Sequence, residues 1–237
     1  MTCCRSSRTA AFTACAFLVA ALMACGAPPP ASSPAASAAP AVTRDDRQPN
    51  LVASRPRIVV LGDSLTAGLG LPPDQAYPTL LQQRLDKEGL KYEVVNAGVS
   101  GDTSAGGLAR LDWALEGDVR VLIVALGGND GLRGLPAEEL KANLSQIVEH
   151  AQKRHIQVVL AGMEAPPNFG QSYIVSFHQI YPEVARQYKV PLVPFLLQGV
   201  AGIDTLNQRD GIHPTAEGAR IVADNIWPVL RPMLTTS

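Results

Sequence analysis

The chain has 237 residues, of which 46% are hydrophobic and 17% are charged, and its mean hydropathy is +0.09. This apolar content excludes a wholly disordered chain, and the length fits one domain with additional segments. The formal net charge of −1 provides no basic field for a polyanion, so we expect no nucleic-acid partner.

All four cysteines lie at the front of the chain, and the last of them is Cys25. The rest of the chain therefore excludes a disulfide framework, a cysteine-ligated metal and a cysteine nucleophile. The sequence also contains neither an HExxH zinc motif nor a Walker A phosphate loop. We accordingly expect no metal and no organic cofactor.

Residues 1–24 have the pattern of an export signal. Arg5 and Arg8 give a positive start, and the apolar run over 10–23 is shorter than the about 20 residues that span a membrane. The run ends in the letters LMAC, which resemble the lipobox of bacterial lipoproteins, where the signal is cleaved before a cysteine that then carries lipid. An ordinary secretory signal with an incidental cysteine is the alternative.

Residues 25–55 are predicted to form a tether. Fifteen of the eighteen residues over 26–43 are Ala, Pro or Ser, so this segment lacks the side chains needed for a core. Such a composition is typical of a semi-extended linker. We therefore predict an exported protein whose lipidated Cys25 is anchored in the membrane of a bacterial cell envelope, facing the periplasm or the cell surface.

From residue 56 onward, short apolar runs alternate with helical patterns. Runs typical of buried parallel strands lie at 58–61, 92–96, 119–126, 156–161 and 191–195. Apolar residues recur at helical spacing over 77–85, 140–151 and 216–230. This alternation predicts a three-layer α/β/α domain over 56–237, with a flavodoxin-like, five-stranded parallel sheet. Ligands of such sheets bind beyond the carboxyl ends of the strands.

Glycine-rich turns with polar side chains follow the first three predicted strands. They are GDSL at 62–65, SGDT at 100–103 and GGND at 127–130. A serine beside a helix start lies where free N–H groups favour developing negative charge, and Gly101 and Asn129 are candidate donors to an oxyanion. Each motif taken alone is also explained locally, by helix caps at Asp63 or Ser64 and at Asp102 or Thr103, and by an Asx turn at Asn129.

A fourth motif, DGIHP at 210–214, precedes the last predicted helix. Asp210 stands three residues before His213, and a turn would bring its carboxylate within hydrogen-bond reach of the imidazole. Such a contact would select one tautomer of the ring and stabilise its protonated form.

The four motifs occur in order and together resemble those of the SGNH/GDSL hydrolases over residues 57–232. The longer strings GDSLTAG, SGDTSAGGLARL and LGGNDGLRG are most similar to the bacterial thioesterase I, lysophospholipase and arylesterase branch. The resemblance implies that Ser64 is the nucleophile, His213 the general base and Asp210 its orienting carboxylate. It also implies an oxyanion hole made by the Ser64 N–H, the Gly101 N–H and the Asn129 amide.

The resemblance further implies a monomeric serine esterase that acts on small esters, lysophospholipids and acyl thioesters through an acyl-enzyme. In relatives the loop that contains Leu132 and Leu135 contacts the acyl chain; ordinary packing of this loop is the alternative. Two other functions remain open, a carbohydrate O-acetylesterase and a non-catalytic surface-binding lipoprotein. The presence of Ser64, Asp210 and His213 together disfavours the binding protein.

Overall fold

The computed structural model of the protein describes residues 55–235. The predicted export signal, the lipidation site Cys25 and all but the last residue of the predicted tether lie outside this range. Among the described residues, no helix combines the length and the apolar character that a membrane crossing requires.

Five parallel strands form a sheet with the order β2-β1-β3-β4-β5. Their bounds are Arg57–Gly62 for β1, Glu93–Gly98 for β2, Val119–Ala125 for β3, Gln157–Ala161 for β4 and Leu192–Val193 for β5. The chain adds β2 on one side of β1 and the later strands on the other side, so the topological switch point lies between β1 and β3. The predicted flavodoxin-like parallel sheet is confirmed.

The two central strands are apolar along most of their length because helices cover both of their faces. Ile58 to Leu61 in β1 and Val121 to Ala125 in β3 are at most 1% exposed. The fifth strand is shorter than predicted. Pro191 and Pro194 flank its two residues, and proline has no N–H to donate to a strand ladder.

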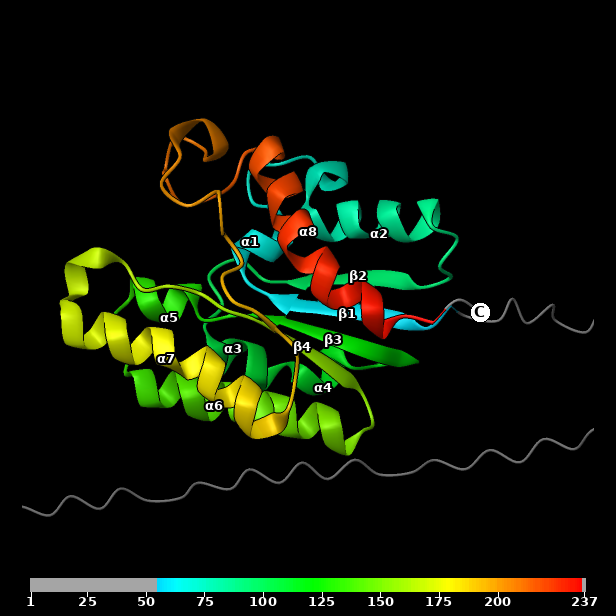
Figure 1. The fold of residues 1–237 in the computed structure, drawn as a ribbon, viewed down its shortest axis with the longest axis horizontal. Helices are drawn as coiled ribbons and strands as arrows, with labels where there is room; N and C mark the ends of the chain where they lie inside the picture. The colour runs from blue at the N-terminus through cyan, green and yellow to red at the C-terminus, as the bar shows by residue number, and fades with distance from the viewer. Residues whose placement is uncertain (1–54, 236–237) are drawn as a thin grey trace, which may run out of the picture. The chain divides into compact units, whose positions relative to one another are not determined.

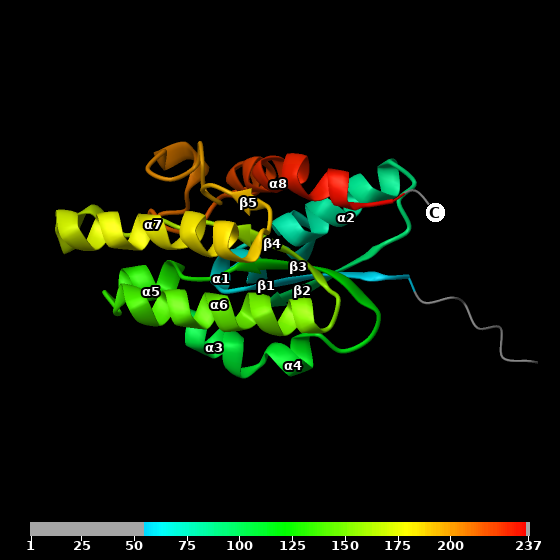
Figure 2. The ribbon, with the colours of Figure 1, turned by 60° about the horizontal axis from the view of Figure 1, so that its bottom comes forward.

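Helices cover both faces of the sheet, as Figures 1 and 2 show. On one face lie α2 (Tyr77–Lys87) and α8 (Ala216–Leu230). The other face carries α3 (Ser104–Ala109), α4 (Leu111–Ala114), α6 (Ala137–Lys153) and α7 (Gln171–Tyr188). Short 3₁₀ turns lie at Pro73–Gln75, Pro167–Phe169, Asp204–Leu206 and Arg231–Met233. The three-layer α/β/α arrangement is therefore confirmed.

The helical patterns identified in the sequence do not include α7, which holds Pro182 in its interior. Proline removes a helical N–H and disfavours a helix in the absence of tertiary contacts. Here Phe177, Tyr181 and Val184 are buried in the core and hold the helix in place.

The carboxyl ends of the strands meet at one edge of the sheet, on the left of Figure 1. Two short helices, α1 (Ser64–Ala67) and α5 (Gly128–Leu132), begin at this edge. The start of β1 and the end of α8 lie at the opposite edge. All four sequence motifs are therefore grouped at the edge where ligands of such sheets bind.

Candidate active site

The turn from β1 into α1 presents the Ser64 side chain at the carboxyl edge. Asp63 caps α1, because its carboxylate accepts a hydrogen bond from the Leu65 N–H at 3.0 Å. A Cβ atom at Gly62 would lie 1.9 Å from the Thr66 hydroxyl oxygen, so this tight turn requires glycine. The cap that was the local alternative for Asp63 exists, and it leaves the Ser64 hydroxyl free for another contact.

A continuous hydrogen-bond chain joins Ser64 to residues that follow it by about 150 positions. The His213 Nε2 atom lies 2.9 Å from the Ser64 Oγ, and the His213 Nδ1 atom lies 2.7 Å from the Asp210 Oδ2. The turn expected between Asp210 and His213 is present, with Gly211 at a positive φ of 71°. The loop before α8 thus brings an imidazole and its carboxylate partner to the end of β1.

Hydrogen bonds hold the Asp210 carboxylate in its ionised form. The backbone N–H groups of His213 and Ile212 donate to its Oδ1, and together with the His213 side chain they lower the pKa of Asp210 to about 2. An ionised carboxylate only accepts, so it places the ring proton of neutral His213 on Nδ1. The Nε2 lone pair then faces the Ser64 hydroxyl, as proton removal from that hydroxyl requires.

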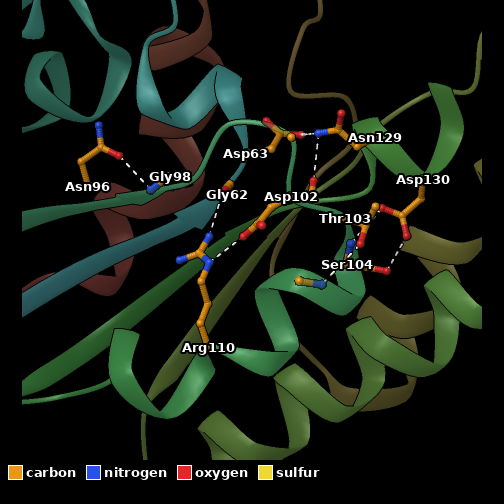
Figure 3. Close-up of polar contacts among 12 residues, drawn as sticks. Gly62, Asp63, Asn96, Gly98, Asp102, Thr103, Ser104, Arg110, Asn129 and Asp130 are labelled. Atoms are coloured by element: carbon orange, nitrogen blue, oxygen red, sulfur yellow. Dashed lines mark hydrogen bonds and ion pairs between the residues drawn. The ribbon is translucent and has the colours of Figure 1, made fainter. Parts of the chain in front are cut away.

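The Asn129 side chain lies at the same edge of the sheet as the hydrogen-bonded Ser64, His213 and Asp210, and it connects two other loops. Its Nδ2 donates to the Asp102 carbonyl oxygen at 2.8 Å and to the Asp63 Oδ2 at 3.3 Å (Figure 3). The two acceptors lie in two other loops, one after β1 and one after β2. The Asn129 side chain therefore does not form the local Asx turn that was the alternative. The amide is held at the point where the β1, β2 and β3 loops meet.

The loop after β2 contains Gly101 at a positive φ of 86°. Its carbonyl oxygen accepts a hydrogen bond from Arg133 at 2.8 Å, whereas its N–H donates to no acceptor within residues 55–235. Of the two cap candidates that follow, Thr103 is the residue that caps α3. Asp102 instead forms an ion pair with Arg110.

A cavity of about 410 Å³ opens beside the Ser64 hydroxyl. Ser64, Asn129, Leu132 and His213 line it, whereas Gly101 and Leu135 are not among its lining residues. The half-buried Leu135 is held elsewhere, with its carbonyl accepting from the Tyr173 hydroxyl at 2.8 Å.

Half of the residues that line the cavity were not singled out by sequence reasoning. They follow β4 or β5 and are apolar except for Glu164 and Asn207; the apolar ones include Met163, Ala165, Pro166, Phe195 and Leu197. Their position after a strand is the signal that would have identified them, since ligands of parallel sheets bind there. No polar motif marks them, because they contribute shape and apolar surface.

These features coincide with the comparisons to known proteins. The sequence profile of the GDSL-like lipase/acylhydrolase family matches residues 60–221. The chain belongs to this family. The resemblance seen in the sequence motifs is therefore confirmed, as is the prediction that the protein is an enzyme of this hydrolase class.

Individual relatives of this GDSL-like hydrolase match across the whole folded domain. "Esterase TesA" of Pseudomonas aeruginosa is 47% identical over 178 residues, which cover 75% of this chain and 89% of the relative. "Thioesterase 1/protease 1/lysophospholipase L1" of Escherichia coli strain K12 is 39% identical over 178 residues, covering 75% and 84%. A crystal structure of TesA superposes with a TM-score of 0.73 at 46% identity, covering 75% of this chain and 99% of that one.

A second carboxylate of this GDSL-like hydrolase, that of Asp63, is buried directly under the site. Asp63 is 2% exposed, and this burial raises its pKa from 3.8 to about 6, although the Leu65 N–H and the nearby His213 favour the charged form. Within the described range, no group of three or more His, Cys, Asp or Glu side chains is arranged to hold a metal ion.

We expect Asp63 to make the folded state less stable as the pH rises. The folded protein binds the Asp63 proton more tightly than the unfolded chain, so unfolding free energy falls between about pH 4 and pH 6 and stays lower above that. A shift from 3.8 to about 6 corresponds to about 3 kcal/mol. Asp63→Asn keeps the size and the cap acceptor but cannot ionise, so this decline disappears. Urea unfolding of both proteins at pH 4 and pH 7 measures it, and equal pH dependence would contradict the assignment.

Proposed function

We propose that the protein is a serine esterase that hydrolyses small carboxylic esters and acyl thioesters through an acyl-enzyme on Ser64. The observation that carries this proposal is the hydrogen-bond chain from Asp210 through His213 to Ser64 at the wall of an apolar cavity. The names of the relatives, which include esterase, thioesterase and lysophospholipase, support the same range of substrates.

The first half of the reaction forms the acyl-enzyme. The His213 Nε2 accepts the proton of the Ser64 hydroxyl while the Ser64 Oγ attacks the acyl carbonyl carbon. Asp210 holds the imidazole in place and stabilises the positive charge that the ring acquires. The protonated ring then donates its proton to the leaving alcohol or thiol as the tetrahedral intermediate collapses. In the second half, His213 activates a water molecule that attacks the acyl-enzyme and releases the acid.

Three donors are proposed to stabilise the oxyanion of the tetrahedral intermediate. The N–H groups of Ser64 and Gly101 have no acceptor among the described residues. The third donor is the Asn129 amide, whose bond to the Asp102 carbonyl keeps it oriented. When the oxyanion forms, the amide gives up its longer, 3.3 Å contact with Asp63 and donates to the oxyanion instead. Removal of one such donor costs about 2.7–4 kcal/mol of transition-state stabilisation.

The apolar cavity is proposed to accept the acyl or aryl group of the substrate, with Leu132 at the end of α5 on its wall and Leu135 outside its lining. Phe195, Leu197 and Ile212 extend this apolar wall. A sugar ring would need several hydrogen-bond partners around it. Outside the catalytic motifs, the cavity lining supplies only the polar side chains of Glu164 and Asn207. The lining therefore favours an acyl ester over an acetylated carbohydrate.

A series of p-nitrophenyl esters of increasing acyl length, measured beside an acetylated sugar, tests this function. We expect kcat/KM on the aryl esters to exceed that on the sugar and to rise when the acyl chain extends beyond acetate. A higher kcat/KM on the acetylated sugar would instead indicate a carbohydrate O-acetylesterase. Absence of hydrolysis of every ester would indicate a non-catalytic binding protein.

We also propose that the protein is exported and anchored in the bacterial cell envelope by lipid on Cys25. The letters LMAC at 22–25 and the Ala, Pro and Ser-rich segment that follows support this proposal. The start of β1, to which the predicted tether connects in sequence, lies at the edge of the sheet opposite the carboxyl ends of the strands.

Cys25→Ser is expected to abolish the incorporation of an alkyne-tagged fatty acid into the protein in cells. Lipoprotein processing attaches the acyl chains to the protein through this cysteine, and serine lacks the thiol that starts the process. The matched control is Cys4→Ser, which removes another cysteine of the same leader and should leave labelling unchanged. Labelling of the Cys25→Ser protein at the wild-type level would contradict lipidation at this position.

A further inference from the structure

Arg110 joins the two loops that carry the proposed nucleophile and the proposed oxyanion hole. It stands between α3 and α4, and its side chain runs back to the carboxyl edge of the sheet (Figure 3). Its Nε donates to the Asp102 Oδ2 at 2.6 Å, and its Nη2 donates to the Gly62 carbonyl oxygen at 2.9 Å. One guanidinium thus contacts the residue after Gly101 and the residue two before Ser64.

The contact with Gly62 restrains the end of β1. The Gly62 carbonyl oxygen also accepts the Val99 N–H at 3.0 Å, so two donors from the segment after β2 hold this peptide. Because Ser64 follows within two residues, a shift of the Gly62 peptide would displace the Ser64 hydroxyl from His213.

The contact with Asp102 restrains the Asn129 amide. Arg110 binds the carboxylate of Asp102, and the carbonyl oxygen of the same residue accepts the Asn129 amide at 2.8 Å. Arg110 also balances the charge of Asp102, whose side chain is only 19% exposed. Without Arg110, the negative charge of the Asp102 carboxylate would be unpaired near the place where negative charge develops in the reaction.

A separate contact keeps the same region folded. Asp130 in α5 accepts the Ser104 N–H at 2.8 Å and the Ser104 hydroxyl at 2.5 Å, and it fastens α5 to the start of α3 (Figure 3). This contact does not involve Arg110. Loss of Arg110 should therefore change the spacing of the loops without detaching them.

We propose that Arg110 is a positioning residue that sets the relative placement of the Ser64 hydroxyl, the Gly101 N–H and the Asn129 amide. The proposal rests on the serine esterase function argued above. It assigns to Arg110 no contact with the substrate, so its effect belongs to kcat rather than to KM.

Steady-state kinetics on p-nitrophenyl butyrate, with thermal melting of the same preparations, test this role. We expect Arg110→Gln to lower kcat by roughly 10- to 100-fold through displacement of the reacting groups, with little change in KM. Arg110→Lys should recover part of the loss, because lysine keeps the charge beside Asp102 but cannot make both contacts. The matched control is Arg57→Gln at the opposite end of β1, where Arg57 pairs with Glu93 at 2.9 Å. This control should keep the wild-type kcat.

Two further variants test whether Arg110 acts through Asp102. Asp102→Asn should lower kcat in the same direction, and the Asp102→Asn, Arg110→Gln double variant should lose no more than Arg110→Gln alone. Fully additive losses would overturn the connection through Asp102. If Arg110→Gln does not fold, Asp102→Asn and Arg110→Lys provide the same test.

The two proposals fail in different ways. If the wild-type protein hydrolyses no ester, the proposed function is overturned. If the wild-type protein is active and Arg110→Gln keeps its kcat per folded molecule, the positioning role is overturned, even where the variant melts at a lower temperature.

Discussion

Replacement of Ser64 by alanine is expected to abolish ester hydrolysis in a protein that still folds. The Ser64 hydroxyl lies 2.9 Å from the His213 Nε2, and the cap that begins α1 comes from Asp63 rather than from Ser64. The substitution therefore removes the attacking atom and leaves the local fold intact. Loss of a serine nucleophile of this kind lowers kcat by roughly 10⁶-fold. Hydrolysis of p-nitrophenyl butyrate by the purified variant measures the effect.

A fluorophosphonate probe shows whether the lost hydroxyl is the reactive one. Intact-mass measurement should find the adduct on the wild-type protein and none on Ser64→Ala. The matched control is Ser100→Ala, which removes an exposed serine hydroxyl from the neighbouring loop and should keep both labelling and activity. A wild-type rate in folded Ser64→Ala protein would refute the acyl-enzyme mechanism.

The second large effect is expected from Asn129→Ala, which should lower kcat by about 100- to 1,000-fold and leave KM nearly unchanged. The amide is proposed to meet the negative charge that develops on the carbonyl oxygen only in the transition state. An interaction made only there appears in kcat. Ground-state binding comes mainly from the apolar cavity wall, which this substitution leaves in place.

A purely structural role of Asn129 makes a different forecast. Its amide joins the Asp102 carbonyl to the Asp63 carboxylate, so its loss would then lower the melting temperature while kcat per folded molecule stayed constant. Asn225→Ala is the matched control, because the Asn225 amide also donates to two acceptors, the carbonyls of Leu196 and Gln198, at 3.1 Å and 2.8 Å. We expect it to affect stability and not kcat. If Asn129→Ala behaves like this control, Asn129 is not an oxyanion donor.

Local features of the chain could be predicted because they depend on neighbours in the sequence. The buried strand over 58–61 shows as a continuous apolar run, since a parallel strand covered on both faces needs apolar side chains throughout. The contact between Asp210 and His213 spans three residues and follows from one turn. The order of the motifs along the chain was enough to indicate the hydrolase family and to single out Ser64, Gly101 and Asn129.

Contacts between distant segments were decided only by the tertiary structure. The Ser64 hydroxyl meets His213 across 149 positions, and this distance became short only because β1 and the loop before α8 end at the same edge of the sheet. The helix α7 persists in spite of Pro182 because its apolar face is buried in the core.

The dependence on contacts between distant segments also explains why the sequence motifs did not identify the role of Arg110 or the cavity wall. Arg110 lies within the string SGDTSAGGLARL, but the string alone assigns it no role. Its proposed role follows from the Gly62 carbonyl oxygen, which lies 48 positions earlier in the chain and 2.9 Å away in the fold. The cavity wall after β4 and β5 likewise consists of ordinary apolar residues such as Met163 and Phe195. Residue type and spacing record local conformation, whereas the partners of a side chain across the sheet depend on how all the elements pack.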